Sequence, residues 1–575
     1  MKDTCKSQIA VTKTELPDAD WQREMIFPYC KEHTDGSRIL INSVTFTCYS
    51  DQGYIYVSME KCPSELTLVI NGTKISLSDA TPKVTLKIDI SSITLNGENH
   101  ILIITDKETE MCNNTFIKVY IPYPVLKRCS VKEAGINEDM IQSISDIIEQ
   151  DIKNGFPAAQ LTMIKDGKIF YENAWGRLNS YDKNGQFTPD SPHANQNTLF
   201  DLASVTKMFS VNYAIQKMVT DGSLKLDTKV SSFLGDPFFE NVININYKGA
   251  EITDTEFLRK RKSEITIRDL LKHQGGFPPD PQYYNLYFDA ETQKHSSDKK
   301  NLLYAGNEED VITKEDTITA ICKTPLMYNP GSKTVYSDVD YMILGLIIEK
   351  VTGKNLDEYL KDEFWKPLNL KNITYTPLEN GFETGDCAAT ELNGNTRDGS
   401  VHFPGIREHT LQGEVHDEKA FYCMGGISGH AGLFSNSTDL AVAASLMLTG
   451  GYGKKRFFSK DVIESFTAPE SELYPEWGLG WWRNADNRRV CVFGPNANSY
   501  VYGHRGWTGT FIYIDPVNNV VISYLTNKIN SPVADPAKNP NIFTGSNYRS
   551  ANPSFIPYYI NLGLSYERKD NERKW

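Results

Sequence analysis

The sequence predicts an α+β protein in two parts, a small all-β sandwich followed by a larger domain with one antiparallel sheet, flanking helices and a helical lobe. Short alternating strand patterns fill residues 37–120. In the rest of the chain, strand patterns occur near 158–174 and 499–526, with helical patterns between them. Because strands from both ends of the larger part must pair to form one sheet, we expect a functional cleft between that sheet and the helical lobe.

Length and composition limit the number of domains and the class of protein. The chain has 575 residues, too many for a single hydrophobic core, and its 40% hydrophobic and 23% charged residues are typical of an ordinary globular protein. A net charge of -13 argues against a nucleic-acid partner, because such partners need a basic surface. No apolar run is long enough for a transmembrane segment, and no export signal is visible at the N-terminus of this sequence.

The first part of the chain is expected to be structural. Residues 1–27 read as an irregular leader, and residues 28–124 as an antiparallel β-sandwich with turn signals such as Asn71-Gly72. It could serve as a spacer, or it could bind carbohydrate or cell wall. Six of the ten cysteines lie before residue 130, where one or two disulfides are possible, whereas buried free thiols are expected in the larger domain.

The second domain, residues 125–575, is expected to be catalytic. It opens with a helix over 137–154 and a hairpin of two strands, 158–165 and 168–174, joined by Asp166-Gly167. Helical and loop-rich sequence follows, with a buried helix over 339–352 closed by Gly353. Strand patterns then return at 489–493, 499–504, 510–514 and 520–526, before a terminal helix that begins near residue 555.

The strongest chemical signal is the segment LFDLASVTKMFSVNYAIQK, residues 199–217, where Ser204 and Lys207 are three positions apart. On a helix they would lie on one face, so the amine could take or share the hydroxyl proton. A lone Ser-x-x-Lys match is more often a helix start with a capping serine and a solvated lysine. Here the apolar spacing predicts a buried helix, in which inward polar groups are costly unless they are used.

Two later segments could complete such a site. Tyr336 stands in the Tyr-Ser-Asp run just before helix 339–352 and could relay a proton between a serine and a leaving group, or it could simply anchor the loop by its ring. His504 stands in the run GHRGWTG, whose glycines would let a substrate backbone come close. Taken alone, it would be an ordinary structural histidine.

Together, Ser-x-x-Lys, Tyr-Ser-Asp and His-x-Gly resemble the motifs of the serine β-lactamase and penicillin-binding protein superfamily. The resemblance covers about residues 137–565 and implies the DD-peptidase/serine β-lactamase fold. Several runs are similar to penicillin-binding proteins of the 4B type, which are named as D-alanyl-D-alanine carboxypeptidases: DLASVTKM, YSDVDYMILGLIIEKVTG, ATELNGNTRDG, LQGEVHDEKAFYCMGGISGHAGLFS and NKINSPVADP. The N-terminal sandwich lies outside the resemblance.

The resemblance also implies roles for individual residues. Ser204 would be the nucleophile and Lys207 its proton acceptor. Tyr336 would be the acid/base, and His504 would line the cleft. The backbone N–H groups of Ser204 and Trp507 would hold the oxyanion.

Two positions depart from the family pattern. His504 replaces the lysine of the usual Lys-Thr-Gly motif, so carboxylate binding could depend on pH, with Arg505 supplying a permanent charge. Asp338 replaces an asparagine, which exchanges an amide donor for an acceptor and puts ordinary β-lactam turnover in question. From these motifs we expect Asp338, Arg505, Gly506 and Thr508 to contact substrate.

Residues 391–430 are acidic and rich in histidine. They could bind a sugar or a peptide, and we favour a polar wall of the cleft, with His416 and Glu418 as substrate contacts. Their spacing matches no metal signature, so neither a metal nor another cofactor is expected.

The sequence therefore predicts an extracytoplasmic serine hydrolase that acts through an acyl-enzyme on peptidoglycan peptide or muropeptide, with β-lactams as covalent inhibitors. A D-alanyl-D-alanine carboxypeptidase is the preferred form. An N-acetylmuramyl-L-alanine amidase or an esterase of the same fold is one alternative. A sensor or wall-binding protein that is acylated without turnover is another.

Overall fold

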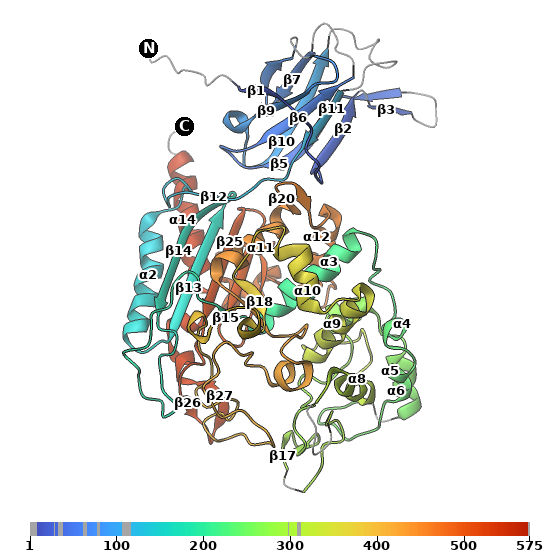
Figure 1. The fold of residues 1–575 in the computed structure, drawn as a ribbon, viewed down its shortest axis with the longest axis vertical. Coiled ribbons are helices and arrows are strands. Elements are labelled where there is room, and N and C mark those ends of the chain that lie inside the picture. The colour runs from blue at the N-terminus through green and yellow to red at the C-terminus, as the bar shows by residue number, and fades with distance from the viewer. Residues whose placement is uncertain are drawn as a thin grey trace. The chain divides into compact units, whose positions relative to one another are not determined.

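The computed structural model describes residues 9–27, 29–32, 38–60, 66–77, 81–105, 117–252, 254–296, 298–306 and 312–572 (Figure 1). It divides into two compact units. The first unit consists of Met1–Arg128, Lys165–Lys168 and Ser445–Lys460, and the second of Cys129–Ile164, Ile169–Ala444 and Asp461–Trp575.

The first unit is built from two antiparallel sheets around a common core of Val, Ile, Leu and Phe side chains. The five-stranded sheet has the order β1 (Val11–Thr14), β9 (Thr85–Asp89), β6 (Tyr54–Met59), β11 (Ile117–Ile121) and β2 (Arg23–Phe27). The four-stranded sheet has the order β5 (Ser43–Cys48), β10 (Gly97–Thr105), β7 (Leu66–Ile70) and β8 (Thr73–Ser76). Strands β3 (Tyr29–Glu32) and β4 (Arg38–Ile41) form a separate pair, as do β20 (Gly451–Tyr452) and β21 (Lys455–Arg456).

The prediction of an irregular leader over residues 1–27 was wrong for its described part. Strand β1 pairs antiparallel with β9, and β2 pairs with β11, so both are edge strands of the five-stranded sheet. All four residues of β1 are exposed, and only Phe27 of β2 is buried. Edge strands with so little burial lack the apolar alternation by which strands are recognised in a sequence.

The second unit is organised on an antiparallel sheet in which the two ends of the unit meet, as predicted. Within this unit the strand order is β14 (Lys168–Gly176), β13 (Ala158–Lys165), β25 (Val520–Thr526), β24 (Phe511–Asp515), β23 (Tyr502–Arg505) and β22 (Trp482–Arg483). Helices α2 (Glu138–Lys153) and α14 (Phe555–Glu572) pack on each other (Figure 1). Their apolar side chains share a core with side chains from β13, β24 and β25.

The middle of the second unit is helical. Its helices are α3 (Tyr213–Thr220), α4 (Ser231–Leu234), α5 (Pro237–Glu240), α6 (Thr255–Lys262), α7 (Ile267–Leu271), α8 (Lys314–Lys323), α9 (Asp338–Thr352), α10 (Leu356–Leu360), α11 (Ser437–Thr449) and α12 (Lys460–Thr467). Short strands form three further small sheets: β15 (Phe200–Asp201) with β19 (Leu433–Ser435) and β18 (Ile373–Tyr375), β16 (Phe288–Asp289) with β17 (Lys294–His295), and β26 (Val533–Asp535) with β27 (Asn539–Phe543).

One strand prediction in this unit was wrong. Residues 489–493 were expected to be a strand, but Val490–Phe493 forms the one-turn helix α13, which ends at Gly494 with φ 83°. Val492 and Phe493 are both buried although they are neighbours. A strand would send neighbouring side chains to opposite faces, so the apolar run alone could not identify the element.

The cysteine predictions can be followed only in part. Cys5, Cys62 and Cys112 lie outside the described residues. Cys322, Cys387 and Cys423 in the second unit are buried free thiols, as expected, but Cys491 is an exposed free thiol. No helix within the described ranges has both the length and the apolar character needed to cross a bilayer.

The loop that carries His430 packs closely against the backbone of α9 at Gly429. A methyl group on Gly429 would lie 2.1 Å from the carbonyl oxygen of Tyr341 and 3.2 Å from the Cα of Gly345, both in α9. The loop and α9 can therefore touch only because residue 429 has no side chain.

We predict that Gly429→Ala lowers the free energy of unfolding by about 1–3 kcal/mol, because the added methyl group overlaps backbone atoms that cannot move aside. Denaturant unfolding followed by circular dichroism measures the change. Gly385→Ala is the matched control, since no atom lies within 4 Å of its new methyl group. Equal stability of the two variants would contradict the close packing of the loop against α9.

Candidate active site

The serine segment is more irregular than the helix that was expected to begin at Ser204–Lys207. A 3-10 turn (Ala203–Val205) and a π-helical turn (Met208–Asn212) precede α3. Ala203 has φ 46°, a left-handed conformation that is costly for any residue with a side chain and that tends to occur at functional sites. The carboxylate of Asp201 holds this bend by accepting the backbone N–H of Ala203 at 2.8 Å. The bend leaves the Ser204 side chain partly exposed.

Lys207 is fully buried and donates three hydrogen bonds. Its Nζ lies 3.1 Å from Ser204 Oγ, 2.8 Å from Asp338 Oδ1 and 3.0 Å from the carbonyl oxygen of His430. An ammonium group has three N–H bonds and no acceptor, so these contacts use its full capacity. The predicted serine–lysine pair is therefore present in space, with the lysine as the donor.

Tyr336 lies beside this pair. Its ring centroid is 4.8 Å from Lys207 Nζ, 4.5 Å from the ring of His273 and 6.1 Å from the ring of His504. The loop that carries it is fixed from both sides, because Val335 donates its N–H to the carbonyl oxygen of His273 and Ser337 Oγ donates to that of Pro278. The Tyr336 hydroxyl is buried and has no hydrogen-bond partner among the described residues. It is thus an uncommitted phenol near the serine.

His504 is fully buried on β23, with its ring 4.7 Å from that of Trp482. Burial, with the nearby Lys207 charge, holds the pKa of His504 well below its usual range. Nδ1 lies 2.8 Å from the carbonyl oxygen of Arg505, which can only accept, so Nδ1 carries the proton and Nε2 is a free acceptor. The predicted pH-dependent charge on His504 was therefore wrong, because the ring is neutral at physiological pH.

The charge of Lys207 depends on Asp338. Burial alone would lower the pKa of Lys207, but the Asp338 carboxylate outweighs burial and the pKa is raised. In the same way, burial would raise the pKa of Asp338, but Lys207 and Lys419 hold it below its ordinary value. Burial raises the pKa of Tyr336, and Lys207 opposes that rise. Lys207 is thus an ammonium and Asp338 a carboxylate, so the predicted role of Lys207 as proton acceptor requires that its amine first give up a proton.

The two backbone N–H groups predicted to hold the oxyanion are available to donate to a substrate. No acceptor for the N–H of Ser204 or that of Trp507 is found in the described part of the chain. A methyl group on Gly506 would lie 2.4 Å from the carbonyl oxygen of Leu202, so only glycine lets the end of β23 reach the serine segment. The Thr508 hydroxyl donates to the carbonyl oxygen of Asp201 at 2.8 Å and is fully buried. Thr508 therefore anchors the turn to the serine segment, and its hydroxyl hydrogen is not available to a substrate.

The other predicted substrate residues are already paired within the protein or lie elsewhere. His416 is buried with Nε2 2.8 Å from Glu391 Oε2, and Glu418 accepts from Arg397 at 2.9 Å. They form an internal polar wall, which removes the basis for a direct contact of His416 with substrate. Arg505 follows His504 along β23, so its side chain leaves from the opposite face of the sheet.

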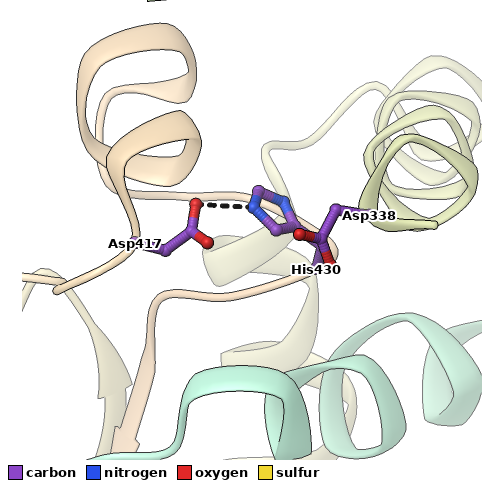
Figure 2. Close-up of side chains that lie close together, drawn as sticks. All are labelled: Asp338, Asp417 and His430. Carbon is purple, nitrogen blue, oxygen red and sulfur yellow. Dashed lines mark hydrogen bonds and ion pairs between the residues drawn. The ribbon is translucent and has the colours of Figure 1, made fainter. Parts of the chain in front are cut away.

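A set of charged residues that sequence reasoning did not assign surrounds Asp338. Lys419 is ion-paired to Asp280, lies 3.3 Å from Asp338 Oδ2 and 4.0 Å from Asp417 Oδ2. Asp417 accepts from His430 Nε2 at 2.8 Å, as Figure 2 shows. Since the carbonyl oxygen of His430 accepts from Lys207, these contacts close a ring of alternating charge. In the sequence, the one feature that could have pointed to this set of charges is the closeness of Asp417 and Lys419 within the acidic run of residues 391–430.

Asp338, Asp417 and His430 could in principle hold a metal ion, since one ligand atom from each lies within 4.8 Å of the others (Figure 2). The ammonium groups of Lys207 and Lys419 already neutralise both oxygens of Asp338. His430 Nε2 must carry a proton to bond the Asp417 carboxylate and so cannot also bind a metal. The donor set therefore fits a protonated network and not a cation.

Comparison with known proteins agrees with this geometry. A family model described as Beta-lactamase matches residues 144–545. The chain belongs to the Beta-lactamase family. It is 45% identical over 423 residues to a protein of Escherichia coli strain K12 named "Putative D-alanyl-D-alanine carboxypeptidase", covering 73% of this chain and 90% of that protein. A protein of the same name from Salmonella typhi is 42% identical over 427 residues, or 74% and 90% of the two chains.

Similarity to solved structures agrees with the predicted fold class. Simvastatin synthase from Aspergillus terreus matches with a TM-score of 0.52 at 16% identity, over 76% of this chain and 99% of that chain. The hydrolase EstCE1 matches with a TM-score of 0.50 at 18% identity, over 74% and 99%. The family match and the relatives establish a serine-type hydrolase with an α+β fold.

We predict that Lys419→Met lowers the free energy of unfolding by about 1–3 kcal/mol, because it leaves the partly buried carboxylates of Asp338 and Asp417 without their shared cation. Thermal and denaturant unfolding test this. Lys366→Met, at a lysine whose side chain is 72% exposed, should change stability by less than about 0.5 kcal/mol. A Lys419→Met protein as stable as the wild type would contradict the charge ring.

Proposed function

We propose that the chain is a penicillin-binding serine hydrolase that cleaves cell-wall peptide through an acyl-enzyme, in the preferred form a D-alanyl-D-alanine carboxypeptidase. The observation that carries this is the convergence of Ser204, Lys207, Tyr336 and His504, from three distant segments, around one partly exposed hydroxyl. The names of the relatives point to the same substrate. Such a substrate places the enzyme outside the cytoplasm.

The charge states favour a proton relay through Tyr336. Ser204 Oγ attacks the amide carbonyl while its proton passes to the Tyr336 oxygen, and the Tyr336 proton passes to the leaving nitrogen. Lys207 remains an ammonium and stabilises the negative charge that builds up on the serine and phenol oxygens. The carbonyl oxygen is held by the N–H groups of Ser204 and Trp507. Water then attacks the acyl-enzyme, and the relay runs in reverse to release the acid.

This scheme explains why neither Lys207 nor Tyr336 needs to be deprotonated at rest. The pKa of each group is raised, so a resting free amine or phenolate would be rare. A phenol that accepts one proton while it gives up another requires no net charge change. The same geometry would serve a muramyl-L-alanine amidase or an esterase, and the choice among these is an outcome of the experiment below.

We predict that Ser204→Ala abolishes both covalent labelling by a penicillin and the release of D-alanine, because no other residue takes over the acyl transfer. Whole-protein mass spectrometry and a D-alanine assay on muropeptides measure the two effects. Ser232→Ala, at an exposed serine in α4, should behave as wild type. Release of whole stem peptide from muramic acid would favour the amidase, and labelling without any turnover would favour the sensor.

We predict that Asp338→Asn makes acylation fail as pH rises. Without the carboxylate, burial dominates and lowers the pKa of Lys207, so the ammonium that the relay needs is lost on the alkaline side. The measurement is kcat/KM from pH 6 to 10 as a ratio to the wild type, which should drop steadily with rising pH.

Asp362→Asn, at a carboxylate paired to two partly exposed lysines away from the serine, should leave that ratio flat. If instead the ratio for Asp338→Asn rises with pH, Lys207 acts as a free base and the relay scheme fails.

A further inference from the structure

His273 lies two residues after α7, packs against Tyr336 and has no role in the scheme above. Its imidazole is fully buried, and the two ring centroids are 4.5 Å apart at an angle of 38°. The carbonyl oxygen of His273 accepts the N–H of Val335 at 2.9 Å, and its Nδ1 accepts the N–H of Ser337 at 3.2 Å. One residue therefore contacts the phenol ring and the backbone amide on each side of it.

Tyr336 depends on such contacts because its oxygen is not fixed. The hydroxyl is buried without a hydrogen-bond partner among the described residues. A phenol that accepts one proton while it gives up another cannot be held by permanent hydrogen bonds at its oxygen. Its position has to come from contacts with its ring and with the backbone that carries it.

Hydrogen bonds set the protonation state of the His273 ring. Because Nδ1 accepts a backbone N–H, it carries no proton, and the ring proton is on Nε2. Asp340 Oδ2 lies 3.2 Å from the same Nδ1, so the carboxyl group must donate in that contact as a neutral acid. Burial lowers the pKa of His273 to about 3. Burial also raises the pKa of Asp340 well above its usual range, which agrees with a neutral pair.

Asp340 ties this pair to the helix that also controls the lysine. It lies in the first turn of α9, two residues after Asp338, which is bonded to Lys207. A methyl group on Gly275 would lie 2.5 Å from Asp340 Oδ1, so the turn that follows the imidazole packs closely on this carboxyl group. One helical turn thus fixes both the ammonium of Lys207 and the ring that packs on Tyr336.

The conformation of His273 is unfavourable in two respects. Its φ of 55° is left-handed, which is costly for a residue with a side chain. Its Nε2 is buried without a hydrogen-bond partner in the part of the chain that the structure describes. Costs of this kind tend to be retained where a site requires them, and here they accompany the contacts with Tyr336.

We propose that the hydrogen-bonded pair of His273 and Asp340 positions Tyr336, so that the phenol oxygen stays within reach of both Ser204 and the leaving nitrogen. The proposal rests on the proposed function, in which Tyr336 relays the proton. Neither member of the pair touches substrate, so both are positioning residues that act through the phenol.

Two substrates with the same acyl group, one an amide and the other a thioester, test this role. When the C–N bond breaks, the amine must receive a proton, whereas a thiolate can leave without one. His273→Ala should lower kcat/KM for the amide by about tenfold to a hundredfold, as expected for a misplaced reacting group, and by less for the thioester. Tyr336→Phe gives the largest difference between the two. An equal loss for both substrates in His273→Ala would overturn the proposal.

Conservative variants identify the contacts that matter. His273→Asn should recover part of the amide activity, because its amide oxygen can accept the Ser337 N–H. Asp340→Asn, whose amide N–H can donate as the neutral acid does, should stay near the wild type, whereas Asp340→Ala should behave like His273→Ala. Equal losses in Asp340→Asn and Asp340→Ala would contradict the neutral pair. His193→Ala, at an exposed histidine of the second unit, is the control.

Crystal structures of the wild type and of His273→Ala separate this proposal from the proposed function. In the variant, the Tyr336 oxygen should shift relative to Ser204 Oγ or occupy more than one position. Such a change would support the pair as a positioning device even if no peptide is cleaved. An unchanged, singly positioned Tyr336 in His273→Ala would overturn the proposal, whether or not the enzyme is active.

Discussion

The buried ion pair between Lys207 and Asp338 is the contact on which the rest of the active site depends. Burial of an ammonium group is costly unless an anion lies against it, and here the carboxylate is 2.8 Å away. The pair fixes Lys207 as a donor to Ser204, and the charge of Lys207 in turn moderates the pKa of Tyr336. A neutral residue in place of Asp338 would change the protonation of the whole site.

Asp338 is itself held by a second cation. Lys419 contacts its other oxygen and is paired to Asp280, while Asp417 and His430 complete the ring. Sharing one carboxylate between two lysines prevents either pair from neutralising itself by proton transfer, because the carboxylate is stabilised from both sides. The network thus keeps Lys207 charged without immobilising it in a single bidentate pair.

The sequence predicted the sheet, the paired ends of the second unit and the convergence of three motifs, since these depend on apolar periodicity and on short local patterns. It predicted the chemistry of His504 wrongly, because the charge of an imidazole depends on burial, which no local pattern reveals. The sequence also gave no reason to single out Lys419, since its partners Asp280 and Asp338 lie far away along the chain. The edge strand β1 was not predicted because all of its residues are exposed, so its sequence lacks the apolar alternation that identifies a strand.

Thr508 illustrates the same limit. Motif position suggested that Thr508 faces substrate, but its hydroxyl bonds the backbone of Asp201 instead. Residue type and spacing identify the reacting groups, whereas the charges that tune them emerge only from three-dimensional packing.

Neutron diffraction at neutral pD would test the central claim most directly, because it locates the exchanged hydrogens on Lys207, Asp338 and Tyr336. The account predicts three deuterons on Lys207 Nζ, none on Asp338 and one on the Tyr336 oxygen. Two deuterons on Lys207, with the third on Asp338, would contradict it.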